Sequence, residues 1–140
     1  EHSLEVQLPF LVSTLGEFTL VPLVVGGATP DEVALLLREV WGGEETLVVV
    51  SSDLSHFLPY EAARRRDRGT AEAITALAPR LEPEDACGAA PVNGLLVVAR
   101  QRGLEAELVD LRNSGDTAGG RNQVVGYGAF VFREREADHA

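Results

Sequence analysis

Two titratable side chains follow an apolar run near the middle of the chain. In the stretch "TLVVVSSDLSH", Asp53 and His56 come after the run that ends at Val50. A carboxylate beside an imidazole orients it, raises its basicity, and can bind a divalent metal or move protons. Ligands of open α/β sheets bind at the carboxyl ends of strands, so this position favours a site. The alternative is structural: Asp53 or Ser52 caps a following helix, and His56 packs beside it.

The only cysteine, Cys87, is a third candidate. It precedes Gly88 and a predicted helix that begins near Pro91. The helix dipole favours a thiolate at this end, which suits a metal ligand or a nucleophile. The alternative is a small buried apolar side chain, the usual environment of a lone intracellular cysteine. A single cysteine excludes an internal disulfide framework and fits a reducing cytoplasm.

The remaining candidates carry weaker signals. His2 lies at the start of the sequence, where a histidine without an anchor ordinarily has no role. The segment "NSGDTAGGRN", residues 113–122, can present backbone N–H groups to an anion or an oxygen-rich ligand, or form only turns. His139 lies in a charged tail and indicates nothing. Walker loops, GxGxxG, GxSxG and CxxC motifs do not occur, so nucleotide-binding, ester-hydrolase and thioredoxin-like functions have no support.

Length and composition indicate one globular domain. The chain has 140 residues, 45% of them hydrophobic, and a formal net charge of -10. That charge excludes general affinity for a nucleic-acid backbone or an anionic lipid surface. The sequence contains no apolar run long enough to span a membrane and does not begin like a signal peptide. We therefore expect a cytoplasmic protein that binds neither nucleic acid nor membrane.

The first half of the chain predicts a βαβ unit. Apolar spacing predicts a helix with Ser3 as its N-cap and a kink or break at Pro9. Residues 17–27 and 46–53 are apolar and β-branched, which is typical of buried strands. Between them, Thr29 and Glu32 form a capping box ahead of a helix. Strand, helix and strand in this order predict a parallel sheet.

The second half predicts two helices and two strands. The helices are expected over residues 60–79 and from near Pro91 to Gly103, and the strands over 104–115 and 124–134. Residues 1–132 form the expected domain, and 133–140 a solvated, charged tail. The fold class is therefore α/β, with a mostly parallel or mixed sheet flanked by helices.

Five ordered segments of the chain resemble the Memo family, also labelled AmmeMemoRadiSam system protein B. They are "EHSLEVQLPFL", "PLVVGG", "VVVSSDLSHF", "DACGAAPVNGLL" and "LRNSGDTAGGRNQVVGYGAFVF", which run from residue 1 to about 132. The resemblance implies a fold related to class III extradiol (LigB-like) dioxygenases, which use non-haem iron. It covers the C-terminal half of the family domain.

The resemblance also implies a pocket lined by histidines, an aspartate and a cysteine. His2 matches the histidine of the family's "EHS" segment, Asp53 and His56 match its "SSDxxH" pair, and Cys87 matches the thiol of its "CG" segment. In family members that hold a metal, this thiol is a ligand together with two histidines. Cys87 is then a ligand for iron or copper, Asp53 holds a histidine in its tautomer, and His2 and His56 face the substrate or support the ligands.

The two ligand histidines belong to "PHAGY"-like and "G-S-H"-like segments that do not occur in this sequence. We therefore expect no catalysis from residues 1–140 alone. A half-domain exposes a large apolar face, so we expect a homodimer across it. Three functions follow from the resemblance. They are a metal-capable, redox-linked protein, an extradiol-type dioxygenase, and a non-enzymatic scaffold that works with AMMECR-type and radical SAM proteins.

Overall fold

Helices and one antiparallel sheet make up the chain. The computed structural model describes residues 2–117 and 119–135. Its elements in chain order are α1 (Leu8–Leu15), α2 (Pro30–Val40), β1 (His56–Leu58), α3 (Tyr60–Thr75), α4 (Ala89–Arg102), β2 (Leu104–Asn113), the short 3-10 helix η1 (Ser114–Asp116) and β3 (Val124–Glu134).

The sheet is built on one long hairpin. β2 and β3 pair antiparallel along their length, and β1 pairs antiparallel with the other side of β3, which gives the order β1-β3-β2. The register shifts between Leu108 and Asp110 on β2, and again in β1, where Phe57 has a positive φ of 58°. The α/β class is confirmed, but the described strands are antiparallel where the sequence predicted a mostly parallel or mixed sheet.

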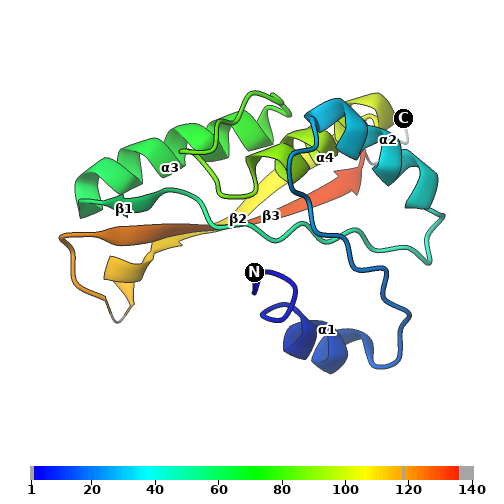
Figure 1. The fold of residues 1–140 in the computed structure, drawn as a ribbon, viewed down its shortest axis with the longest axis horizontal. Coiled ribbons are helices and arrows are strands. Elements are labelled where there is room, and N and C mark those ends of the chain that lie inside the picture. The colour runs from blue at the N-terminus through cyan, green and yellow to red at the C-terminus, as the bar shows by residue number, and fades with distance from the viewer. Residues whose placement is uncertain (1, 118, 136–140) are drawn as a thin grey trace, which may run out of the picture.

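The core lies between the sheet and helices α2, α3 and α4. These helices lie on one side of the β2–β3 ribbon, and α1 lies on the other (Figure 1). One apolar cluster joins α2 to α4 through Val33, Leu37 and Val98. A second joins α3 to α4 through Ile74 and Leu96, with side chains of β3 against it.

Local sequence signals locate the helices well. Thr29 and Glu32 form the expected capping box at the start of α2. α4 ends at Gly103, whose left-handed conformation (φ 70°) suits a residue without a Cβ. The start of α1 is a correction: its N-cap is Gln7 and not Ser3. The helix begins at Leu8, so the predicted helical stripe is interrupted next to Pro9, which falls in the first turn, where proline is tolerated.

The two predicted strands of the βαβ unit are a second correction. Residues 18–25 and 47–51 belong to no ladder, and their backbones form no hydrogen bond with any described residue. Their composition favours strands, but a strand also needs a neighbour, and residue propensity cannot supply one. Val25, Val48 and Val50 pack against the cluster between α2 and α4.

The last strand ends where the sequence predicted, at Glu134. Arg133 and Glu134, which the predicted charged tail also included, belong to β3 and pair with β2. Among the described residues, no helix is both long and apolar enough to cross a membrane.

Candidate metal site

Two chain segments meet at Asp53 and Cys87. The Cys87 N–H donates to the Asp53 carbonyl (3.2 Å), and the Asp53 N–H donates to Cys87 Sγ (3.3 Å). Ser52 Oγ accepts from Gly88 N–H (2.8 Å) and donates to the Asp53 carbonyl (2.7 Å). A Cβ on Gly88 would lie 2.8 Å from Ser52 Cβ, so glycine allows this close approach. The backbone segments that carry the thiol and the carboxylate are therefore held together.

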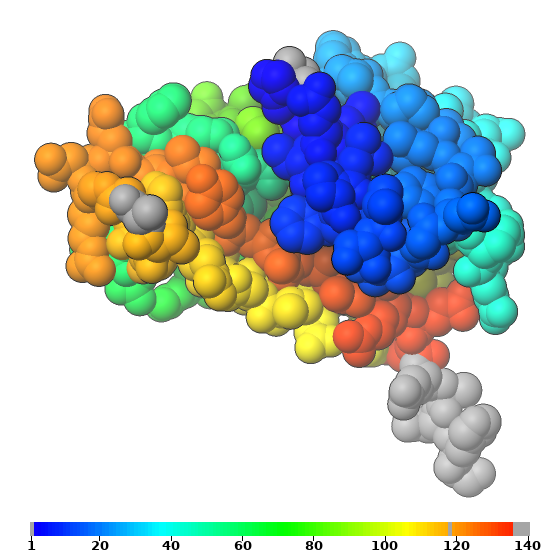
Figure 2. Space-filling model, turned by 90° about the horizontal axis from the view of Figure 1, so that it is seen from below, coloured from blue at the N-terminus to red at the C-terminus, as the bar shows by residue number. Residues whose placement is uncertain are grey.

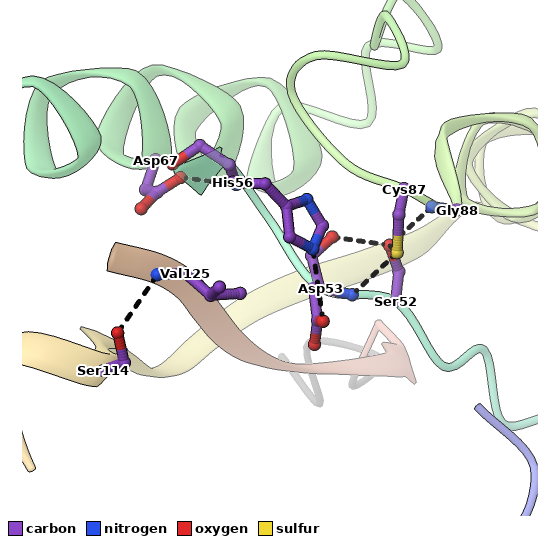
Figure 3. A network of polar contacts seen from close by, with 9 residues as sticks. Ser52, Asp53, His56, Asp67, Cys87, Gly88, Ser114 and Val125 are labelled. Atoms are coloured by element: carbon purple, nitrogen blue, oxygen red, sulfur yellow. Dashed lines mark hydrogen bonds and ion pairs between the residues drawn. The ribbon is translucent and has the colours of Figure 1, made fainter. Parts of the chain in front are cut away.

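His56 completes the group. Its Nε2 lies 3.4 Å from Asp53 Oδ2, and the two side chains are 30% and 47% exposed. The segment between them is bonded to β3: the Leu54 N–H donates to the Gly126 carbonyl, and the Gly126 N–H donates to the Ser55 carbonyl. These bonds fix the backbone that carries Asp53 and His56. Figure 3 shows the two side chains next to each other, with Cys87 beside Asp53.

The ligand atoms of Asp53, His56 and Cys87 all lie within 4.8 Å of one another. Two ligands bound at about 2.0–2.3 Å to one tetrahedral ion lie roughly 3–4 Å apart, so small side-chain rotations bring all three onto one ion. Thiolate and imidazole are ligands that copper and iron accept. The group therefore fits a transition-metal ion, and its exposure leaves one side open.

A buried carboxylate that the sequence analysis missed supports the site. Asp67 on α3 is 2% exposed, and its Oδ1 accepts from the Ser55 N–H (3.0 Å). Burial raises the pKa of Asp67 above its ordinary value, and the hydrogen bond from the Ser55 N–H acts against this rise. In "ARRRDRG" the residue reads as part of a solvated face. The available signal was its place on the apolar stripe of α3, between Ala63 and Ile74.

The glycine-rich loop after β2 forms turns. Gly115 N–H donates to Asn113 Oδ1, Asn113 N–H to Asp116 Oδ2, and Gly119 N–H to the Ser114 carbonyl. These amides are thus occupied within the loop, which supports the turn interpretation. The loop meets β3 where Val125 N–H donates to Ser114 Oγ (Figure 3).

Tyr60, the first residue of α3, contacts this loop. Its hydroxyl donates to Asp116, and the Arg121 guanidinium lies 4.3 Å from the centre of its ring. The hydroxyl bond is the main cause that lowers the pKa of Asp116, and the same bond raises the pKa of Tyr60. The loop therefore stays close to the start of α3, a few residues beyond His56.

Neither the helix-capping alternative for Ser52 and Asp53 nor the buried alternative for Cys87 agrees with the structure. Ser52 and Asp53 do not cap α3, whose N-cap is Pro59, and Ser52 instead bonds Gly88 at the N-cap of α4. Cys87 is exposed, so it is not a buried apolar side chain.

The structure does not bring His2 to this group. Its imidazole is 84% exposed and bonds Glu5 at 2.8 Å. The other histidine of the sequence, His139, lies outside the described residues.

Comparison with known proteins gives the family. The sequence model of the Memo-like proteins matches residues 1–131. The chain belongs to the Memo family. A MEMO1 family protein of Archaeoglobus fulgidus is 39% identical over 145 residues, which cover 95% of this chain and 55% of that protein.

Other relatives of this Memo-family chain show the same coverage. A MEMO1 family protein of Methanopyrus kandleri is 39% identical, over 95% of this chain and 52% of its own length. One from Aquifex aeolicus is 36% identical, over 94% of this chain and 54% of its own length. The chain spans about half the length of the curated relatives it matches.

Proposed function

We propose that this Memo-family chain contributes a metal-binding, redox-linked site in which Cys87 is a ligand. The convergence of Asp53, His56 and Cys87 within 4.8 Å carries the proposal. Iron and copper are the metals that the donor set and the family resemblance favour, and either would supply one-electron redox chemistry when bound.

Each side chain has a distinct role in this proposal. Cys87 supplies the thiolate, the strongest donor of the three for a soft or borderline ion. Asp53 lies 3.4 Å from His56 Nε2, close enough to select the imidazole tautomer and its orientation. His56 then either binds the ion through Nδ1, the ring nitrogen that does not face Asp53, or faces a substrate on the open side. His2, which is far more exposed, acts in this site only if the segment before α1 moves toward it.

A metal titration of residues 1–140 tests the proposal. Competition with a chromophoric chelator gives the affinity for Fe(II) and for Cu(I), in wild type and in Cys87→Ala. We expect Cys87→Ala to lose more than the roughly 10–100-fold that removal of an outer partner costs. His2→Ala is the matched control, and we expect it to keep the wild-type affinity. Equal affinities for wild type and Cys87→Ala would refute the ligand assignment.

An extradiol-type dioxygenase is the alternative activity. Its iron is held by two histidines and one carboxylate. Among the described residues, the group contains one carboxylate, one histidine and a thiolate. This donor set weighs against ring cleavage. Oxygen consumption with catechols, measured on the iron-loaded chain, would have to rise above the metal-free rate for this alternative to stand.

The cellular setting is proposed from the resemblance and from the composition. We propose that the chain works in the cytoplasm beside AMMECR-type and radical SAM proteins, as part of a modification system. A scaffold without catalysis would act through the same partners. Affinity capture with these two kinds of protein, in wild type and in Cys87→Ala, separates the cases: a scaffold binds them equally well without the thiol.

A further inference from the structure

Phe57 is an exposed aromatic side chain next to the candidate metal site. Most exposed large apolar side chains belong to the first 50 residues, and Figure 2 shows the first 25 or so of these residues (blue) gathered in one continuous area. Beyond residue 50, Phe57 is the most exposed large apolar side chain that the structure describes, at 70%. Its ring centre lies 5.7 Å from that of the His56 imidazole, with 43° between the two ring planes. The site therefore has an aromatic neighbour whose surface is mostly open.

The backbone of Phe57 has a conformation that a bulky residue rarely adopts. Its φ of 58° lies in the left-handed region, where a Cβ crowds the following carbonyl oxygen. His56 and Leu58 are two positions apart on β1, but they pair with the adjacent residues Val125 and Val124 of β3. Phe57 is therefore the extra residue of a β-bulge. Bulges redirect a side chain and are frequent beside active sites.

Packing accounts for one other residue with this backbone conformation but not for Phe57. Among the described residues, Leu77 is the second non-glycine residue with a positive φ, at 52°. Its side chain packs against the apolar cluster that joins α3 to α4, so burial offsets the strain. The Phe57 ring is 70% exposed and belongs to neither of the two apolar clusters described above. Backbone strain that the fold does not need is typical of functional sites.

We propose that Phe57 is a specificity-determining residue of the metal site, and that its ring forms an aromatic wall for a ligand bound on the open side. This role rests on the metal site proposed above. Aromatic rings contact each other at centre distances of about 4.5–7 Å, and the Phe57 ring already lies within that range of the His56 imidazole. Because the two rings are tilted and most of the phenyl surface is open, a second aromatic group can pack against it. The ligand class is therefore one that carries a flat aromatic group next to its metal-binding atom.

The ligand preference of the metal-loaded chain tests the proposal. Co(II) is the probe, because its thiolate charge-transfer band reports binding at Cys87 and its visible bands report an added ligand. Imidazole and 4-phenylimidazole offer the same nitrogen donor and differ in the phenyl group. We expect wild type to prefer 4-phenylimidazole, and we expect this preference to fall about 2- to 10-fold in Phe57→Ala, the range of one aromatic contact. Phe57→Tyr is the conservative variant: it keeps a ring and should keep the preference.

Urea unfolding of the metal-free chain tests the backbone strain separately. Glycine adopts a positive φ without a clash, so the urea midpoint of Phe57→Gly should be higher than that of Phe57→Ala and at least equal to that of wild type. Leu77→Gly is the matched control. It also relieves a positive φ, but it removes a side chain that packs in the core, so its midpoint should fall below that of wild type.

Three outcomes would overturn the proposal. A wild-type chain without a thiolate band would refute the metal site and, with it, this role of Phe57. A normal thiolate band with the same ligand preference in wild type and Phe57→Ala would refute the role of Phe57 and leave the metal site standing. A urea midpoint of Phe57→Gly far below that of wild type would show that the ring stabilises the fold, which would explain its position without a ligand.

Discussion

Gly126 and Asp67 are predicted to be strongly coupled because the carboxylate lies against the glycine. A Cβ at position 126 would lie 2.1 Å from Asp67 Oδ2 and 2.5 Å from its Cγ. Asp67 is 2% exposed and accepts from the Ser55 N–H at 3.0 Å, so the carboxylate cannot move away without losing that bond. Gly126→Ala therefore displaces either the aspartate or β3.

The contacts around Gly126 give the size of the expected loss in the free energy of unfolding. Extra volume in a packed interior costs about 1–3 kcal/mol. If Asp67 swings away, the N–H of Ser55, which is 0% exposed, loses its partner at a further cost of about 1–3 kcal/mol. The gain from replacing glycine in a strand is only about 0.5–1 kcal/mol. We expect Gly126→Ala to lower the free energy of unfolding by roughly 1–5 kcal/mol, a large part of the 5–15 kcal/mol typical of a domain.

Urea unfolding followed by circular dichroism measures this loss. The matched control is Gly69→Ala in α3, where an added Cβ meets no atom within 4 Å. Because alanine favours a helix interior, this control is expected to gain about 0.5–1 kcal/mol. In an Asp67→Ala background the obstructing carboxylate is gone, so Gly126→Ala should cost less than about 1 kcal/mol there. An equal loss of unfolding free energy in both backgrounds would refute the contact between Gly126 and the Asp67 carboxylate. A Gly126→Ala protein as stable as wild type would refute it too.

Three further predictions use the buried and bridging polar groups. Burial raises the pKa of Asp67, so its contribution to stability is greatest below its ordinary pKa and is lost as pH rises through the native pKa. The free energy of unfolding of Asp67→Asn, measured in urea, should therefore rise relative to that of wild type as pH rises through that range. A difference between the two proteins that stays the same at every pH would contradict this. Asn93→Ala removes both side-chain hydrogen bonds to the Leu81 backbone and should cost about 1–3 kcal/mol for each group left unpaired, measured the same way. Tyr60→Phe removes the main cause that lowers the pKa of Asp116, so NMR titration of that carboxyl should show its pKa rising, and an unchanged value would refute the role of the hydroxyl.

Short-range sequence signals correctly predicted where α2 begins and where α4 ends. The capping box at Thr29 and the left-handed Gly103 are short-range features, and the structure confirms both helix ends. β1 was not predicted, because His56–Leu58 becomes a strand only through pairing with β3, far along the chain. Residues 17–27 and 46–53 were predicted as strands of a parallel sheet, but residue propensity does not determine whether a partner strand lies within residues 1–140.

The site was predicted only in part, because local sequence signals identify single residues but not contacts between distant segments. Asp53 and His56 were found because they directly follow an apolar run, and Cys87 because it precedes a helix. Their convergence depends on the bonds between Ser52 and Gly88 and between Asp53 and Cys87, which join positions more than thirty residues apart. That connection was expected only from the resemblance to the Memo family, since spacing along the chain does not encode it.

The coordination of a bound ion tests the central claim most directly. X-ray absorption at the copper or iron edge, on residues 1–140 loaded with one equivalent of metal, reports whether sulfur is bound. We predict one sulfur neighbour with nitrogen and oxygen in wild type, and no sulfur neighbour in Cys87→Ser. A sulfur-free spectrum of the wild-type protein would contradict a metal site built on Cys87, Asp53 and His56.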